Sequence, residues 1–380
     1  MNRLWKIFIA IAILAIMILP SGLFAAAPSY RAETGFHLDW WESPNREKGL
    51  QYHIPIRLGI EYGDLEASVL SGYCYTTYDA PGEDRHSMAD VLDTKLNFSY
   101  ALIDRLPFDV MFGLDFNLPT GRTKLSDDDL TLVMDPDLVS ITSFGEGFNV
   151  NPTISISKGW GSWLAGVGFG YIYRGEYDYG RNFQDYDPGD IYTVTGQLMY
   201  FYKGMWRFRA FANFSTYETD QLDDDNYYDE GDYFQWGLAA LFYKSNYDVE
   251  FIIQNVIRGK SDFSYTTGGR ISKEEDNSHG DEWIATLKAH YSPDDLTTFN
   301  LYVNYLYIDE NGYPEASIYY IGERQKITFG AGVKRNIMNL LTGEFNARGF
   351  FMHDDEAWFH PDDKQSYRGF SLELKLVASF

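Results

Sequence analysis

The chain has very little cysteine, few basic residues and only one long apolar run. Cys74 is the single cysteine among 380 residues, which excludes an intramolecular disulfide and is typical of a buried small residue. Lysine and arginine number 31 against 55 acidic residues, so the formal net charge is −24. Nucleic acid is therefore excluded as a partner, because binding it requires a basic face. The absence of an internal repeat argues against a propeller.

Signatures of catalysis are also missing. The sequence contains no G-x-S-x-G, no H-E-x-x-H and no glycine-rich phosphate loop. The seven histidines are scattered, and His86 followed by Ser87 is an adjacency of low specificity. We therefore predict that the protein is not an enzyme and holds no cofactor.

The one long apolar run lies near the N-terminus. It covers residues 7–19, follows the basic Arg3 and Lys6, and leads into the small residues 25–27. A run of this length is shorter than the roughly 20 residues of a membrane-spanning helix. A basic start, a short apolar core and a small-residue exit predict a secretory signal peptide over residues 1–27, cleaved near 25–27. Residues 28–380 then form a single exported domain.

Aromatic residues and two-residue alternation dominate the rest of the chain. Aromatics make up 17%, with 30 Tyr, 27 Phe and 9 Trp. In segments such as residues 53–62 and 108–118, apolar side chains alternate with polar ones, which predicts β-strands. Tight turns alternate with eight longer and mostly acidic loops, at residues 43–49, 79–90, 120–146, 178–189, 220–231, 261–281, 309–316 and 354–365.

The terminal segment carries the clearest alternation. One of its faces is formed by Phe370, Leu372, Leu374, Leu376 and Phe380. This segment resembles the last strand of bacterial outer-membrane β-barrels, in which the aromatic C-terminal strand is the assembly signal. The resemblance implies a location in the outer membrane of a Gram-negative cell. The partners it implies are outer-membrane lipid, lipopolysaccharide and the barrel-assembly machinery.

These patterns together predict an all-β fold, a transmembrane antiparallel up-and-down β-barrel of about 16 strands with short periplasmic turns and long acidic extracellular loops. Residues 318–334 are among the predicted strands. The first strand, residues 34–42, is the weakest. About 14 strands result if residues 34–42, within a possible N-terminal plug segment of residues 28–49, are a periplasmic or plug segment and another predicted strand is absent.

If one face of each strand contacts lipid, the other faces the lumen. An arginine or lysine facing lipid at mid-membrane would cost about 2–4 kcal/mol, so charged positions are expected inside. As lumen and selectivity residues the alternation predicts Arg57, Asp109, Asp115, Arg207, Arg209, Glu250, Arg258, Lys326 and Arg348. Charges of mixed sign suit a water-filled channel. The alternative is a network of interior salt bridges that stiffens the wall.

The loops contain runs of carboxylates, such as residues 127–129 and 223–225. Divalent cations take carboxylate oxygens, so such loops could bind them, although no stretch has the ligand order of a Ca²⁺ loop and we assign no metal site. The favoured interpretation is that these carboxylates are solvated loop charge. An acidic mouth favours cations. Loop 120–146 is predicted to fold inward and narrow the lumen.

One region carries a narrower resemblance. Phe-Asn-Leu-Pro-Thr-Gly-Arg at 116–122 is followed by Phe-Gly-Glu-Gly-Phe-Asn-Val-Asn-Pro at 144–152, and Gly166, Gly168 and Gly170 come after Trp163. Residues 108–177 thereby resemble outer-membrane transporters associated with meta-pathway phenol degradation, which implies uptake of small molecules.

The sequence therefore predicts a channel for passive diffusion of small solutes through a charged lumen. Two alternatives stay open: a FadL-like transporter of small hydrophobic or aromatic compounds, and a non-conducting structural or adhesive barrel. The solute and the oligomeric state, with a homotrimer as one option, are not determined by the sequence.

Overall fold

The computed structural model describes residues 27–82, 84–180, 183–264, 270–357 and 364–380. The predicted signal peptide lies almost wholly outside these residues. Within them, no helix has the length and apolar character needed to cross a membrane.

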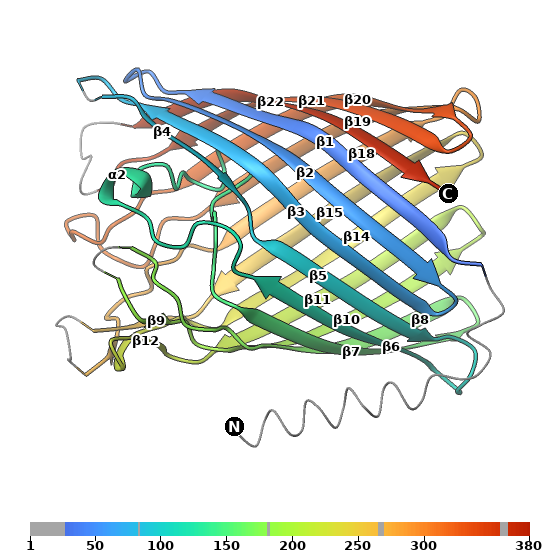
Figure 1. Cartoon of the computed structure of the whole chain (residues 1–380), viewed down its shortest axis with the longest axis horizontal. Coiled ribbons are helices and arrows are strands. Elements are labelled where there is room, and N and C mark those ends of the chain that lie inside the picture. The colour runs from blue at the N-terminus through green and yellow to red at the C-terminus, as the bar shows by residue number, and fades with distance from the viewer. Residues whose placement is uncertain (1–26, 83, 181–182, 265–269, 358–363) are drawn as a thin grey trace.

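The chain forms a closed antiparallel barrel of 16 strands (Figure 1). In chain order its strands are β1 (Ser29–Glu42), β2 (Lys48–Tyr62), β3 (Leu65–Asp79), β5 (Thr94–Leu102), β6 (Asp109–Leu118), β7 (Asn149–Trp160), β8 (Trp163–Ile172), β10 (Ile191–Tyr202), β11 (Trp206–Tyr217), β14 (Tyr233–Lys244), β15 (Tyr247–Arg258), β18 (Glu282–Tyr291), β19 (Thr297–Ile308), β20 (Arg324–Met338), β21 (Leu341–Asp354) and β22 (Gln365–Ser379).

The long connections carry the remaining elements. A short strand, β4 (His86–Val91), pairs with the far end of β3, and a one-turn helix, α2 (Asp127–Leu130), lies in the connection after β6. A small second sheet is built from three loops and contains β9 (Tyr186–Asp187), β12 (Asp220–Leu222), β13 (Asp225–Asp229), β16 (Asp262–Phe263) and β17 (Ser272–Lys273).

The first and last strands close the barrel. β1 pairs with both β2 and β22, and Phe36 lies opposite Leu374. At the end of this seam the Tyr30 amide donates to the Phe380 carbonyl at 2.7 Å, and the Phe380 amide donates back to Tyr30 at 3.0 Å. Residues 29–42, which the plug alternative needed, therefore lie in the wall.

Outward positions are apolar and exposed along each strand. On β2, Ile56 and Leu58 are 53% and 52% exposed, and Arg57 between them points to the other side. An exposed apolar surface that surrounds a barrel is typical of contact with lipid. Aromatic side chains collect beside the tight turns, as Trp160 and Trp163 do around Gly161. They match the girdles found at membrane interfaces.

Tight turns and long loops occupy opposite ends of the barrel (Figure 1). Three of the tight turns contain a glycine with positive φ, namely Gly63 (61°), Gly161 (57°) and Gly204 (65°). Such angles favour glycine because it lacks a Cβ atom. The predicted alternation of turns and loops is confirmed, and β1 begins at the tight-turn end, where β22 ends.

Two predicted boundaries are wrong. β20 begins at Arg324, not at residue 318. Asn311 explains the difference, because its side chain donates to the Tyr319 carbonyl at 2.7 Å and accepts from the Ile321 amide at 3.2 Å. These bonds engage backbone groups that a strand would pair. Conversely, part of predicted loop 79–90 forms β4. This strand pairs with the end of β3 that β5 does not reach.

Candidate functional site

The lumen is the candidate functional site. All nine charged residues predicted to line it occupy inward positions of their strands, because each alternates with outward apolar neighbours and pairs with other inward positions. Their partners differ widely, so the structure divides them into residues open to the lumen and residues already engaged.

Four of the predicted arginines have no carboxylate partner among the described residues. Arg57, Arg207, Arg209 and Arg348 form none of the ion pairs found there. The Arg209 guanidinium lies 5.0 Å from the centre of the Phe211 ring, and that of Arg348 lies 5.1 Å from Tyr302. Stacking on an aromatic face orients a guanidinium without neutralising it. These cations are therefore available to water and solutes.

The inward acids are more engaged. Asp115 accepts from Asn97 at 2.8 Å and from Asn151 at 3.4 Å, both on neighbouring strands. Asp109 accepts from the backbone amide of Asp104 at the adjoining turn, at 2.9 Å. Glu250 lies opposite Lys288 in the register of β15 and β18. The hydrogen bonds to Asp115 fix its position within the wall.

Arg258 lies at the loop end of β15 and faces two acids. It is 3.4 Å from Glu282 and 3.7 Å from Glu230, and its guanidinium lies 5.1 Å from the ring of Tyr233. Burial raises the pKa of the Glu230 carboxyl, and the nearby Arg258 charge opposes that shift. Arg258 thus belongs to a charge cluster at the rim.

The connection between β6 and β7 folds into the barrel. Its residues Met134, Leu138 and Val139 are buried against Trp41 and two side chains of β21, Phe350 and Met352. A second buried cluster joins the same connection to β3 and β4, and its members are Cys74, Met88, Leu125, Leu132 and Phe144. We call residues 119–148 the inner loop. It covers the lumen side of β1 to β4 and β20 to β22.

Arginine and lysine side chains of β20 hold the inner loop by its carboxylates. Arg324 lies 2.7 Å from Asp135, 2.9 Å from Asp137 and 2.7 Å from Asp354 of β21. Lys326 donates to the Asp137 carbonyl and lies 4.8 Å from the centre of the Phe350 ring. Lys326, predicted as a selectivity residue, therefore contacts the loop.

Neutral groups complete the attachment. Gln51 on β2 is fully buried, donates to the Ile141 carbonyl at 2.8 Å and accepts from the Ile141 amide at 2.7 Å. The Asp39 carboxylate accepts from the Ser140 amide at 3.0 Å and from the Ser371 hydroxyl at 2.6 Å. The loop is thus bonded to β1, β2 and β20.

A serine, a histidine and an aspartate meet at this attachment. Ser140 Oγ lies 3.0 Å and Asp39 Oδ1 lies 2.9 Å from the same atom, His37 Nε2. A nucleophilic relay needs the hydroxyl and the carboxylate on different ring nitrogens. The arrangement therefore anchors the loop and lacks the geometry of a catalytic triad.

Helix α2 lies in the first part of the inner loop, and its N-terminus has a capping box. The Ser126 hydroxyl accepts from the Asp129 amide at 3.2 Å, and the Asp129 carboxylate accepts from the Ser126 amide at 3.0 Å. Burial would raise the pKa of Asp129, but hydrogen bonds from Ser126 and the charge of Arg122 outweigh it and lower that pKa. Arg122 also pairs with Asp90 of β4 at 2.8 Å, which ties the start of the loop to the wall.

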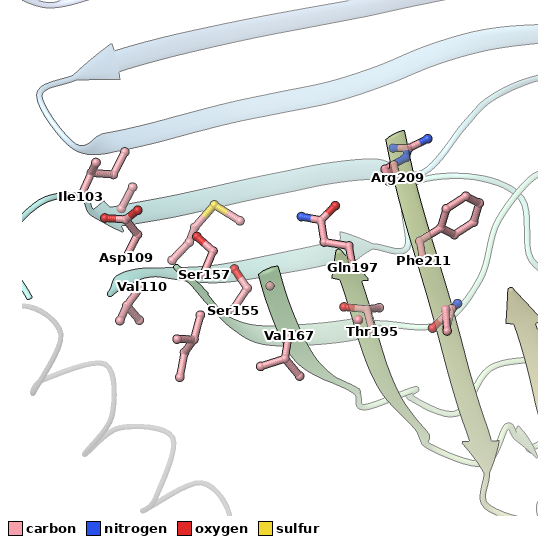
Figure 2. Close-up of a pocket in the computed structure, with 18 residues that line it drawn as sticks. Ile103, Asp109, Val110, Ser155, Ser157, Val167, Thr195, Gln197, Arg209 and Phe211 are labelled. Atoms are coloured by element: carbon pink, nitrogen blue, oxygen red, sulfur yellow. The ribbon is translucent and has the colours of Figure 1, made fainter. Parts of the chain in front are cut away.

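The opposite wall is different in character. In the ring of strands β8 is the seventh and β21 the fifteenth, so they lie across the barrel from each other. A hollow of about 600 Å³ lies along β6 to β11, and the side chains that line it include Ser155, Ser157, Gln197 and Arg209 (Figure 2). The lumen is therefore occupied by the loop on one side and open on the other.

The terminal strand has its apolar face outward. Phe370 packs on Trp40 with ring centres 5.4 Å apart, and Phe380 lies 6.0 Å from Tyr30. Leu374 and Leu376 are 48% and 38% exposed on the same outer face as Leu372. The role of these residues as an assembly signal stays a prediction.

Binding of divalent cations by the acidic loops stays a hypothesis. Over the described ranges, no three His, Cys, Asp or Glu side chains are grouped as ligands of a metal ion.

Several residues of the site were not predicted individually. The loop anchors Asp39, Gln51 and Arg324 occupy inward positions, but alternation gives a side chain's face and not its partner. The acidic residues of 120–146 were predicted as solvated charge, and two of them, Asp135 and Asp137, pair with the wall.

The sixteen-stranded barrel with its outward apolar surface has the architecture of a membrane-spanning β-barrel. No family model matches the chain, and no curated protein matches it in sequence.

Solved structures with a similar fold include a hydrocarbon channel and a porin. The CymD monoaromatic hydrocarbon channel is 11% identical with a TM-score of 0.46, covering 96% of this chain and 92% of that one. The anion-selective porin from Comamonas acidovorans is 12% identical with a TM-score of 0.41, covering 93% and 99%. Acinetobacter baumannii OccAB1 is 8% identical with a TM-score of 0.47, covering 93% and 97%.

Proposed function

We propose that the protein is an outer-membrane channel through which small solutes diffuse passively in a water-filled, charged lumen. The observation that carries the proposal is the set of inward arginines that have no carboxylate partner in the described ranges, Arg57, Arg207, Arg209 and Arg348. An ionised side chain in a dry, unpaired environment costs several kcal/mol. Water in the lumen removes that cost, and the same water provides a path for solutes.

The two alternatives fit this interior less well. A FadL-like transporter needs an apolar interior, and its plug segment would come from residues 28–49, most of which belong to β1. In a structural barrel closed by paired charges, each cationic side chain in the lumen would form an ion pair with a carboxylate, which these four arginines do not do among the described residues. The proposal extends to export by a signal peptide, folding by the barrel-assembly machinery and contact with lipopolysaccharide. It involves no catalysis.

Planar-bilayer recording tests the proposal. The mature chain is refolded in detergent, checked for a heat-modifiable barrel on a gel, and inserted into a bilayer. We expect stable single-channel steps, with a reversal potential shifted toward cations because the loops at the mouth are acidic. An absence of steps from fully folded protein would contradict the proposal.

A further inference from the structure

Three adjacent strands of the open wall carry no charge on their lumen side. The inward positions of β7, β8 and β10 are occupied by Ser, Thr, Asn, Gln, Gly and a few apolar residues. We call six of them the uncharged track: Ser155, Ser157, Gly166, Gly168, Thr195 and Gln197. In Figure 2 the four labelled members, Ser155, Ser157, Thr195 and Gln197, lie between Asp109 at one end and Arg209 with Phe211 at the other.

The register of the strands shapes the track as a shallow trough. Ser157 lies opposite Gly166, which lies opposite Gln197, and the next row is Ser155, Gly168 and Thr195. Neighbouring strands are about 4.8 Å apart, so the backbones of β7 and β10 on either side of the glycines are about 10 Å apart, and the side chains of Thr195 and Gln197 lean over the glycines between them. A Cβ atom at Gly168 would lie 2.7 Å from the Thr195 hydroxyl, which is too close. Glycine at this position therefore leaves room for the hydroxyl and forms the bottom of the trough.

Hydrogen-bonding groups on both sides of the trough are unengaged. In the part of the chain that the structure describes, the side chains of Ser155, Ser157, Thr195 and Gln197 form no hydrogen bond with protein, and Thr195 and Gln197 are exposed to the lumen. By contrast, the next inward residue of β10, Thr193, bonds to Ser215 of β11 at 2.9 Å. Hydroxyl and amide groups both donate and accept.

We propose that the uncharged track binds neutral polyhydroxylated solutes, such as monosaccharides, as they pass through the lumen; the inference rests on the proposed channel function. A polyol offers donors and acceptors along its length and no charge, which matches the track. An anion would instead need the cations that the inward positions of β7, β8 and β10 lack.

Solute uptake into proteoliposomes tests the inference, with ion conductance measured on the same preparation. The probes are glucose, gluconate as an anion of similar size, and triethylene glycol as a neutral solute with fewer hydroxyls. The variant Thr195→Val with Gln197→Leu keeps side-chain size and removes polar groups. Its matched control, Asn300→Leu with Thr328→Val, makes the same kind of change at inward positions of β19 and β20.

We expect wild type to take up glucose faster than triethylene glycol at low solute concentration. The track variant should lose roughly three- to tenfold of its glucose uptake, as expected for the loss of one or two hydrogen bonds, while ion conductance and triethylene glycol uptake stay unchanged. The control variant should behave as wild type.

Three results would overturn the inference while leaving the channel proposal intact. Equal losses in the track and control variants would show that the position of the polar groups does not matter. Equal wild-type rates for glucose and triethylene glycol would show no recognition of hydroxyls. Faster uptake of gluconate than of glucose would assign the wall to anions. Absence of ion conductance from folded protein would instead contradict both proposals.

Discussion

The attachment of the inner loop through Gln51 leads to a quantitative prediction. Gln51 is fully buried and provides the partner of both backbone groups of Ile141, at 2.8 and 2.7 Å. The substitution Gln51→Leu keeps the approximate shape of the side chain and removes both bonds. Leaving a buried donor or acceptor unpaired costs about 1–3 kcal/mol, so the loop loses about 2–6 kcal/mol of attachment.

Hydrogen exchange measured by mass spectrometry reports this loss directly. Even about 2 kcal/mol raises the population of the opened loop about thirtyfold, since each 1.4 kcal/mol is a factor of ten. We therefore expect a peptide covering residues 136–144 to exchange at least about thirtyfold faster in Gln51→Leu. The same variant should show more noise in the open-channel current.

The matched control is Gln254→Leu, which makes the same substitution at an inward position of β15 away from the loop. It should leave exchange at 136–144 unchanged. Unchanged exchange in a correctly folded Gln51→Leu barrel would refute the reasoning, because it would mean that other contacts hold the loop without the two amide bonds.

Two further predictions concern the lumen and the wall. Deleting residues 123–142 should raise single-channel conductance, because the inner loop fills part of the lumen, and unchanged conductance would count against that role. Leu58→Arg, which places a charge on the 52% exposed outer position of β2, should destabilise the barrel in urea titrations by about 2–4 kcal/mol. Leu58→Phe is its apolar control, and equal stability of the two variants would contradict the assignment of this face to lipid.

The wall of the barrel could be predicted from the sequence because its pattern is local. Period-two alternation determines which side chains share a face, and this pattern alone is sufficient to place Arg57 and Asp115 inside. Glycine turns such as Gly161 determine where strands reverse. The alternation wrongly predicted a strand at residues 318–323. There the side chain of Asn311, which is close in sequence, holds the backbone in a loop.

The interior of the barrel could be predicted only in part. Loop 120–146 was expected to fold inward, but its attachment depends on pairs distant in sequence. Gln51 and Ile141 are 90 residues apart, and Ser140 and Asp39 are 101 apart. A single sequence contains no periodic signal for such pairs. The identity of the anchors, and the engagement of Lys326 by the loop, therefore required the three-dimensional arrangement.

The net charge of −24 reflects the acidic loops at the mouth more than the wall of the lumen. Many of the acidic residues lie in the connections between strands, and inward acids such as Asp115 are bonded to amides of the wall. The inner loop covers one side of the lumen and engages Arg324 and Lys326, so these cations are less available to solutes.

The uncharged track faces the open side of the lumen, with Arg209 at one end. Selectivity among ions would then be set mainly by the acidic mouth and the few unpaired arginines, and selectivity among neutral solutes by the track. Because these determinants lie on different elements, substitutions in the track should alter sugar uptake without altering the reversal potential.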